Sequence, residues 1–201
     1  MNKKKVFDMA STVLDSRKYY HGTKREISGD YLMPRETFNS LQDGMVSGAF
    51  VTSDINLAKF FAINSCIGMG QTKSIDNKIY LERLADHIRP EFYIYTVYET
   101  PDNPFIHDNE TEYYSTKPIK IAEKQKCNTA QEIEKLGFEI YVLNEPLENK
   151  VNMESGNNLP VRAEMDNAIK QNKFHRVDIA KMIEQQSQYV FQKISRHDGK
   201  E

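Results

Sequence analysis

Residues 92–98, which read FYIYTVY, constrain the fold more than any other segment. Aromatic and β-branched side chains dominate this run, and because they favour extended backbone the run predicts a strand. The sequence TPDNP at 100–104 follows directly and is a strong turn signal. The chain is therefore expected to build a β-sheet that includes this strand.

Weaker signals predict how the other segments alternate around that strand. Apolar residues at helical spacing and capping residues predict helices at 6–17, from Ile55 to a flexible stretch at 68–71, at 78–87, 130–136, 161–171 and 177–194. Further strands are predicted at 19–23, 49–52, 112–115, 118–122 and 138–143, whereas residues 24–48 are typical of a loop with a short helix. Because strands and helices alternate irregularly, the sequence predicts an α+β fold.

Composition narrows the class of protein. The 201 residues are 39% hydrophobic and 28% charged, which is enough for one sizeable core. The formal net charge of −2 gives no basic surplus, so nucleic acid is not a favoured partner. No segment approaches the roughly 20 apolar residues that span a bilayer, and Asp8 interrupts the apolar run that a secretory signal needs. We expect a cytoplasmic protein without a membrane span; translocation into a target cell by a specialised route would leave no signal in the sequence.

The sequence contains few metal or redox signals. Cys66 and Cys127 lie far apart without CxxC spacing, so they are expected to be free thiols in a reducing compartment. The five histidines are scattered and no HExxH motif is present, so no metal site is expected. Glycine-rich loops of the Rossmann or P-loop type are absent as well.

Residues 145–160 carry Asn, Glu and Gly and few core residues, which is typical of a long loop or linker. This segment divides the chain into a first domain at 1–144 and a helical C-terminal extension at 161–201. The amphipathic helices of the extension are expected either to pack on the first domain or to dock a partner.

Three motifs follow one another in the first domain: YYHGTK at 19–24, GAFVTSD at 48–54 with an aromatic-bearing helix behind it, and ETEYY at 110–114. In this order they resemble the mono-ADP-ribosyltransferase superfamily of bacterial toxins. The YHGTK motif is similar to that of diphtheria-type enzymes and of rifamycin-modifying ADP-ribosyltransferases. The segments LMPR at 32–35, AFVTS and FYIYTV are closer to cholera and pertussis toxin subunits.

This resemblance covers roughly residues 18–143 and implies a split, mixed or antiparallel β-sheet core with flanking helices. It also implies that NAD⁺ is the co-substrate and that ADP-ribose is transferred with release of nicotinamide. Glu112 is the implied catalytic carboxylate, because breaking the bond between nicotinamide and ribose develops positive charge that a carboxylate stabilises. Gly22 would hold the carboxamide and His21, also an implied catalytic residue, the adenosine side of the dinucleotide. Thr23 is a further implied NAD⁺-binding residue.

Two phenylalanines, Phe50 and Phe61, stand where diphtheria-type enzymes carry stacking tyrosines, so the resemblance implies that they stack on the nicotinamide ring. Core packing of Phe50, Phe60 or Phe61 is the alternative. The hydroxyls of Thr52 and Ser53 are expected either to brace the catalytic glutamate, as in cholera-type enzymes, or to cap the following helix, a role that Ser53 and Asp54 share as candidates.

Glu110 precedes Glu112 by two residues, so on an extended strand both side chains would point to one face. In arginine-modifying relatives the first glutamate of such a pair orients the acceptor guanidinium. This implies an arginine acceptor on a protein, although His21 stands where cholera-type enzymes carry arginine. The loop at 102–109, with Phe105 expected to be exposed, either contacts a protein target or simply connects strands.

The sequence therefore predicts an NAD⁺-dependent mono-ADP-ribosyltransferase, expected to be a bacterial toxin or effector that modifies a protein. The alternatives are transfer to a small molecule or nucleic acid, simple NAD⁺ hydrolysis, and a degenerate module that binds a partner through its C-terminal helices. Those helices are also the candidate site for an activating partner, because some relatives of this kind need one.

Overall fold

The computed structural model describes residues 17–39, 44–145, 147 and 159–197. Within these ranges the chain forms twelve strands and four helices in two sheets, which confirms the α+β class. The helix expected at 6–17 lies outside the described residues apart from Arg17.

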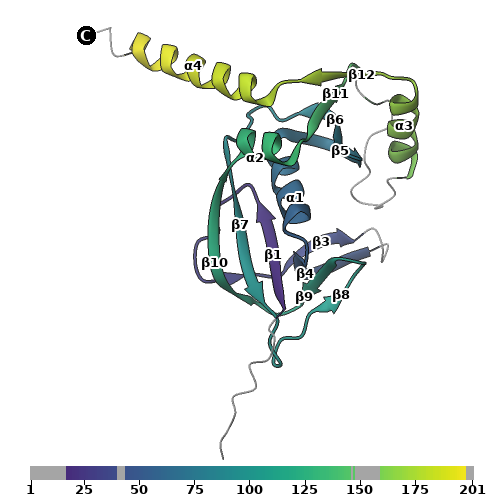
Figure 1. Ribbon diagram of the computed structural model, residues 1–201, viewed down its shortest axis with the longest axis vertical. Coiled ribbons are helices and arrows are strands. Elements are labelled where there is room, and N and C mark those ends of the chain that lie inside the picture. Colours follow the sequence, from purple (N-terminus) through teal and green to yellow (C-terminus); the bar gives the residue numbers. More distant parts are fainter. Residues whose placement is uncertain (1–16, 40–43, 146, 148–158, 198–201) are drawn as a thin grey trace, which may run out of the picture.

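The larger sheet is antiparallel throughout and contains the predicted strand at 92–98 near its centre (Figure 1). Its order is β2 (Tyr31–Leu32), β10 (Ile119–Asn128), β7 (Glu91–Tyr98), β1 (Lys18–Thr23), β4 (Gly44–Thr52), β9 (Glu112–Ser115) and β8 (Ile106–His107). The strand β3 (Arg35–Asn39) pairs with β4 beside this path. A β-bulge interrupts the β7–β10 ladder between Ile121 and Glu123.

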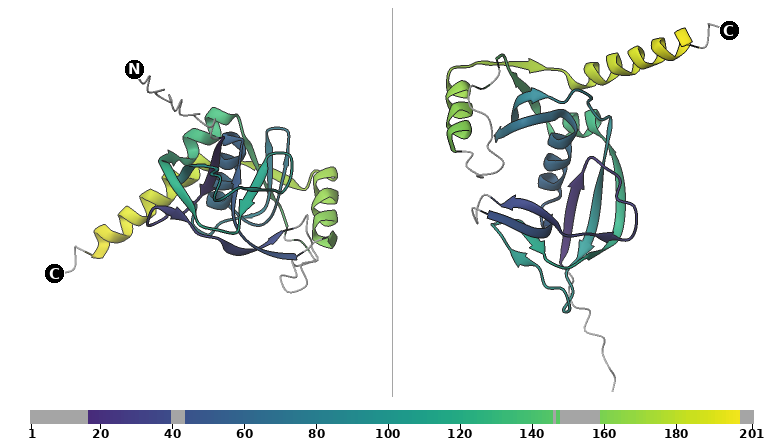
Figure 2. Two further views of the ribbon diagram at one scale, coloured as in Figure 1. Left: turned by 90° about the horizontal axis from the view of Figure 1, so that it is seen from below. Right: turned by 180° about the vertical axis from the view of Figure 1, so that it is seen from behind.

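The smaller sheet is mixed, in the order β12 (Phe174–Val177), β11 (Glu139–Leu143), β6 (Lys78–Leu84) and β5 (Gly68–Ile75), with β11 and β6 parallel. The described ranges also contain four helices: α1 (Ile55–Ile67), α2 (Thr129–Leu136), α3 (Leu159–Lys170) and α4 (Ile179–His197). In both views of Figure 2, α4 extends away from the rest of the molecule.

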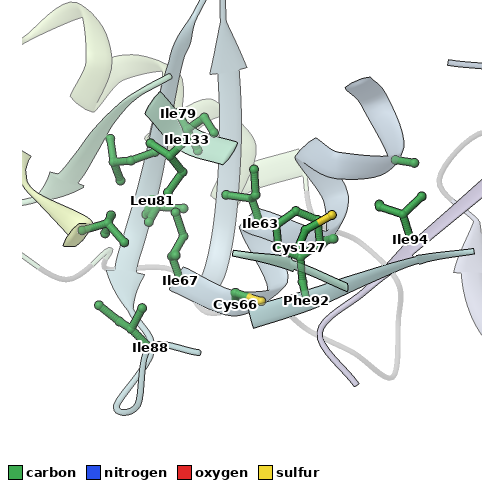
Figure 3. Packing of buried hydrophobic residues seen from close by; sticks show 14 of the residues in the cluster. Ile63, Cys66, Ile67, Ile79, Leu81, Ile88, Phe92, Ile94, Cys127 and Ile133 are labelled. Carbon is green, nitrogen blue, oxygen red and sulfur yellow. The ribbon is translucent and has the colours of Figure 1, made fainter. Parts of the chain in front are cut away.

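The main core lies where α1 packs between the larger sheet and the smaller one (Figure 3). Ile63 and Ile67 of α1, Leu81 of β6 and Phe92 of β7 are completely buried there. Burial of each such side chain stabilises the fold by about 1.5–3 kcal/mol. The helix therefore holds the two sheets together.

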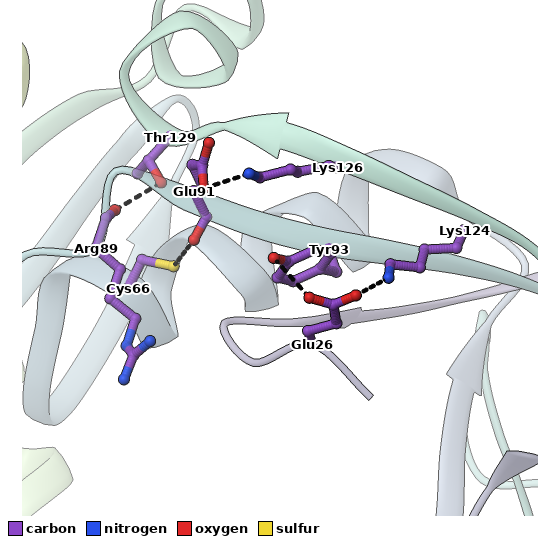
Figure 4. A network of polar contacts seen from close by, with 8 residues as sticks. All are labelled: Glu26, Cys66, Arg89, Glu91, Tyr93, Lys124, Lys126 and Thr129. Atoms are coloured by element: carbon purple, nitrogen blue, oxygen red, sulfur yellow. Dashed lines mark hydrogen bonds and ion pairs between the residues drawn. The ribbon is translucent and has the colours of Figure 1, made fainter. Parts of the chain in front are cut away.

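Both cysteines are free and buried, as predicted. Burial raises the pKa of the Cys66 thiol to about 11, and its Sγ donates to the Glu91 carbonyl over 3.6 Å. Near Cys66, the Thr129 hydroxyl donates to the Arg89 carbonyl at 2.8 Å, while Lys126 pairs with the Glu91 carboxylate at 2.7 Å (Figure 4). These contacts tie the end of β10 to the start of β7.

Three predictions of secondary structure are wrong. Residues 78–84 form strand β6 instead of a helix, because Ile79 and Leu81 alternate into the core between β5 and β11. The segment expected to be loop at 24–48 contains β2, β3 and the first five residues of β4. Strand β2 is stabilised by pairing with the distant β10, whereas β3 pairs with its neighbour β4. The stretch at 68–71 begins β5, where positive-φ Gly70 lies within a break in the β5–β6 register.

The C-terminal extension contributes a strand as well as the two expected helices. Its β12 pairs with β11, and Ile179 at the start of α4 is 3% exposed within the main core. Met165 and Ala168 of α3 pack in a further buried cluster with Leu143 of β11. The extension is thus built onto the smaller sheet. In the parts of the chain described, no helix has the length and apolar character needed to cross a membrane.

Candidate functional site

The larger sheet opens between its two central strands, β1 and β4. Within the described strands these two pair only at Tyr20 and Thr52, while β1 stays paired with β7 along its whole length. Beyond Tyr20 a pocket of about 1120 Å³ lies between β1, β3 and β4, larger than many small-molecule sites. We call it the β1–β4 pocket.

Seven of the residues predicted from the sequence line the β1–β4 pocket. They are His21, Gly22 and Thr23 of β1, Phe50 and Thr52 of β4, Phe61 of α1 and Glu112 of β9. Ser53 and Glu110 are not among the lining residues. Residues that are far apart in sequence therefore line one pocket.

His21 bridges the opening, because its Nδ1 lies 2.8 Å from the carbonyl oxygen of Phe50 on β4. A carbonyl only accepts, so Nδ1 carries the hydrogen. Burial of the ring lowers the pKa of His21 below its ordinary 6.5, and the charge of Arg35 lowers it as well, against the opposing effect of this hydrogen bond. At neutral pH the imidazole is therefore uncharged, with Nε2 as an acceptor. In this state Nε2 can accept a hydrogen bond but cannot donate one.

Gly22 is required by the packing of α1 on β1. A Cβ at this position would lie 1.9 Å from the carbonyl oxygen of Ala58 and 3.1 Å from the Cβ of Ala62. Only glycine allows this close approach. The His-Gly sequence therefore has a structural cause that is independent of any ligand, and it brings the backbone of Gly22 to the wall of the pocket.

The aromatic residues at the pocket differ in their surroundings. Phe61 is 41% exposed although it lines the pocket. Its neighbour Phe60 packs against the main core, with its ring centroid 6.2 Å from that of Phe138. Phe50 is half-buried, and its ring centroid lies 5.4 Å from that of Tyr114, with the two ring planes tilted by 31°. Phe61 is thus the ring most available for a planar ligand, and core packing explains Phe60 alone.

The Glu112 carboxylate is oriented by Asn109, which sequence reasoning did not single out. Asn109 Nδ2 donates to Glu112 Oε2, and Asn109 Oδ1 accepts from the Glu112 backbone N–H at 3.2 Å. The backbone N–H of Asp108 donates to the Glu112 carbonyl at 2.9 Å and closes the turn. No hydrogen bond or ion pair from another described residue reaches Oε1 of Glu112. The spacing Asn-x-x-Glu is the sequence signal for this arrangement.

Thr52 and Ser53 hold the site together without touching the Glu112 carboxylate. Thr52 Oγ1 accepts from the Asp54 backbone N–H at 3.1 Å, and Asp54 caps α1 by accepting from Asn56 N–H at 2.8 Å. The backbone N–H of Ser53 donates to the Thr111 carbonyl at 2.9 Å. Asp54, and not Ser53, is therefore the cap, while Ser53 fixes the residue that precedes Glu112.

Two expectations for the segment before Glu112 are wrong. Glu110 lies in a bend, because β9 begins only at Glu112, so the argument that both glutamates share a strand face fails. Phe105 is not exposed for target contact: its ring packs on Tyr19 at a centroid distance of 4.9 Å, and its N–H donates to Glu99. On this loop Ile106 is the exposed apolar residue, at 42%.

Basic side chains line the pocket in a way that the sequence analysis did not anticipate. Lys24 and Arg25 follow the end of β1, and Arg35 begins β3. The net charge of −2 does not reveal these three residues, because it averages over all charged side chains of the chain. In the described ranges, no group of three or more His, Cys, Asp or Glu side chains is arranged to hold a metal ion.

Comparison with known proteins gives no further identification. No protein-family model, no curated protein and no solved structure matches the chain.

Proposed function

We propose that the protein is an NAD⁺-dependent mono-ADP-ribosyltransferase with its active site in the β1–β4 pocket. The observation that carries the proposal is the convergence, at the opening of the larger sheet, of His21, Gly22 and Phe61 with the Asn109-oriented carboxylate of Glu112. The antiparallel sheet that splits between two central strands agrees with the fold that the motif order implies.

Each residue has a chemical role in this proposal. Phe61, with Phe50 beside it, stacks on the nicotinamide ring. The His21 Nε2 accepts a hydrogen bond from a ribose hydroxyl, and the Gly22 backbone lies against the carboxamide. Glu112 stabilises the positive charge that develops on the ribose when the nicotinamide leaves, because its carboxylate is held in place before the reaction.

The proposed acceptor is a protein side chain, with arginine favoured. Glu110 is exposed two residues before Glu112, where its carboxylate is accessible to an incoming guanidinium. Proteins of this kind act as toxins or effectors on other cells, and we propose this role here as well.

Transfer to protein is tested with biotin-labelled NAD⁺ in a cell lysate. Wild-type protein is expected to label one or a few bands, and Glu112→Gln to lose the label because the amide cannot stabilise the charged ribose. Glu134→Gln, an exposed glutamate on α2, is the matched control and should label normally. Equal labelling by wild type and Glu112→Gln would contradict the assigned site, whereas no labelling by any variant would favour hydrolysis or the partner-binding alternative.

A further inference from the structure

We infer that Lys24, Arg25 and Arg35 form a diphosphate-binding arm of the β1–β4 pocket, which selects ligands that carry two linked phosphates. This inference rests on the proposed function for the identity of the whole ligand. It does not rest on it for the presence of an anion site, since the three cations line one pocket in any case.

Some basic residues that the structure describes pair with a carboxylate, and others, such as Lys78 and Arg83, do not pair with any described carboxylate. Lys24, Arg25 and Arg35 belong to the second group, and all three line one pocket. Cations that converge on a concave surface without a carboxylate partner are the arrangement that binds phosphate groups.

The acidic residues of the pocket do not neutralise this arm. Glu26 lines the pocket, but its carboxylate is paired with Lys124 from β10 and accepts from the Tyr93 hydroxyl at 3.4 Å (Figure 4). Of the other two acids, Asp108 follows β8 and Glu112 begins β9. The charge of the pocket is thus divided, with the Glu112 carboxylate at the start of β9 and the cations just after β1 and at the start of β3.

Strand register gives the spacing between the two ends. Thr52 lies opposite both Tyr20 and Glu112, whereas Arg35 lies opposite Gly48, four residues back along β4. Lys24 is likewise four residues beyond Tyr20. Four residues of extended strand span about 13 Å. The long side chains of Arg35 and Lys24 shorten this gap, so one dinucleotide can place a ribose at Glu112 and its diphosphate at the cations.

The charge of Arg35 acts on His21 at the centre of the pocket, where it lowers the pKa of that imidazole. A bound diphosphate would offset the Arg35 charge, and His21 would then be protonated more readily. Occupation of the arm therefore has a spectroscopic signature at His21 that does not depend on catalysis.

The direct test is calorimetric titration of the full-length protein with inorganic pyrophosphate and with ADP-ribose. Wild type is expected to bind both, and Arg35→Gln to bind each about 10- to 100-fold more weakly, as for the loss of charge-assisted hydrogen bonds. Arg35→Lys should recover part of the affinity. Arg83→Gln, the same change at an exposed site on β6, is the matched control and should bind as wild type does.

The second readout is the NMR titration of the His21 ring with and without pyrophosphate. Its pKa is expected to rise on pyrophosphate binding in wild type and to respond little in Arg35→Gln, which itself should start from a higher value. The inference would be overturned if wild type did not bind pyrophosphate at all. It would also be overturned if wild type, Arg35→Gln and the double variant Lys24→Gln/Arg25→Gln bound pyrophosphate with the same affinity.

Failure of this inference is distinguishable from failure of the proposed function. If Arg35-dependent pyrophosphate binding occurs without nicotinamide release from NAD⁺, the anion site stands and the enzymatic proposal fails. If nicotinamide is released and the KM for NAD⁺ is unchanged in Arg35→Gln, the enzyme stands and the diphosphate arm is wrong.

Discussion

The protonation of His21 makes a measurable contribution to stability at the scale of single residues. Its folded-state pKa is lowered below 6.5 by burial and by Arg35, so the unfolded chain binds the proton more tightly. The stability that neutral His21 provides is complete above pH 6.5 and is lost as the pH falls through the folded-state pKa. We expect the difference in unfolding free energy between wild type and His21→Asn to shrink on acidification. Denaturant titrations from pH 8 to pH 5 measure it, and a difference that grows at low pH would contradict the assignment.

Substitution of Gly22 tests whether this glycine is needed for the packing of α1 on β1, independently of any ligand. Gly22→Ala places a methyl group against the Ala58 carbonyl, where 1.9 Å leaves no space, so α1 or β1 must shift. Overpacking of this kind costs about 1–3 kcal/mol or more. Urea denaturation should show this loss, whereas Ser74→Ala on the exposed edge strand β5 should be neutral within about 0.5 kcal/mol. An undiminished stability of Gly22→Ala would mean that the glycine is not required for the packing of α1 on β1.

Seven of the nine site candidates taken from the sequence line the pocket, because most of them lie in short motifs at the ends of strands. Glu110 was misplaced, since the start of β9 at Glu112 depends on pairing with Thr52, which spacing alone does not reveal. The roles of Asn109 and Arg35 could not be predicted from the sequence. Asn109 matters because it orients the Glu112 carboxylate, and Arg35 because its charge acts on the His21 imidazole, and only the fold brings these groups together.

At the scale of elements, α1 and α2 are joined by an ion pair between Lys59 and Glu132, with Nζ and Oε2 2.7 Å apart and side chains only 8% and 12% exposed. Lys59→Met leaves the nearly buried carboxylate with one ion-pair partner among the described residues, the exposed Lys135, whose Nζ lies 3.7 Å from Oε1. We expect a loss of about 3–5 kcal/mol for this single change. The double variant Lys59→Met/Glu132→Leu should regain most of the loss, because both charges are then absent. A double-mutant cycle by chemical denaturation measures the coupling, and strictly additive losses would contradict it.

Prediction of the elements succeeded where local signals agreed with tertiary pairing. The run at 92–98 and the helix from Ile55 were correct, since side-chain type and capping both act locally. The sequence KIYLERL was misassigned as helix because Leu, Glu, Arg and Lys favour helix, and only pairing with β5 and β11 makes it a strand. The four residues of β12 are too short to give any periodic signal.

At the scale of the whole molecule, the two sheets and the C-terminal extension are expected to unfold together. The extension supplies β12 to the smaller sheet and Ile179 to the main core. Thermal unfolding followed by circular dichroism and by tyrosine fluorescence should therefore give superimposable transitions. A chain that ends at residue 145 should melt at lower temperature and bind a hydrophobic dye. Two separate transitions, or an unaltered melting temperature of the shortened chain, would show that the extension folds independently.

The central claim is that the β1–β4 pocket cleaves NAD⁺ at its nicotinamide bond with Glu112 as the essential carboxylate. Proton NMR of nicotinamide release by the purified protein, with wild type and Glu112→Gln side by side, tests it most directly, because water can replace a missing acceptor. The account predicts release by wild type and a rate at least about 100-fold lower in Glu112→Gln, with NAD⁺ still bound. Equal release by both proteins, or intact NAD⁺ even with lysate present and a melting temperature that NAD⁺ does not change, would contradict it.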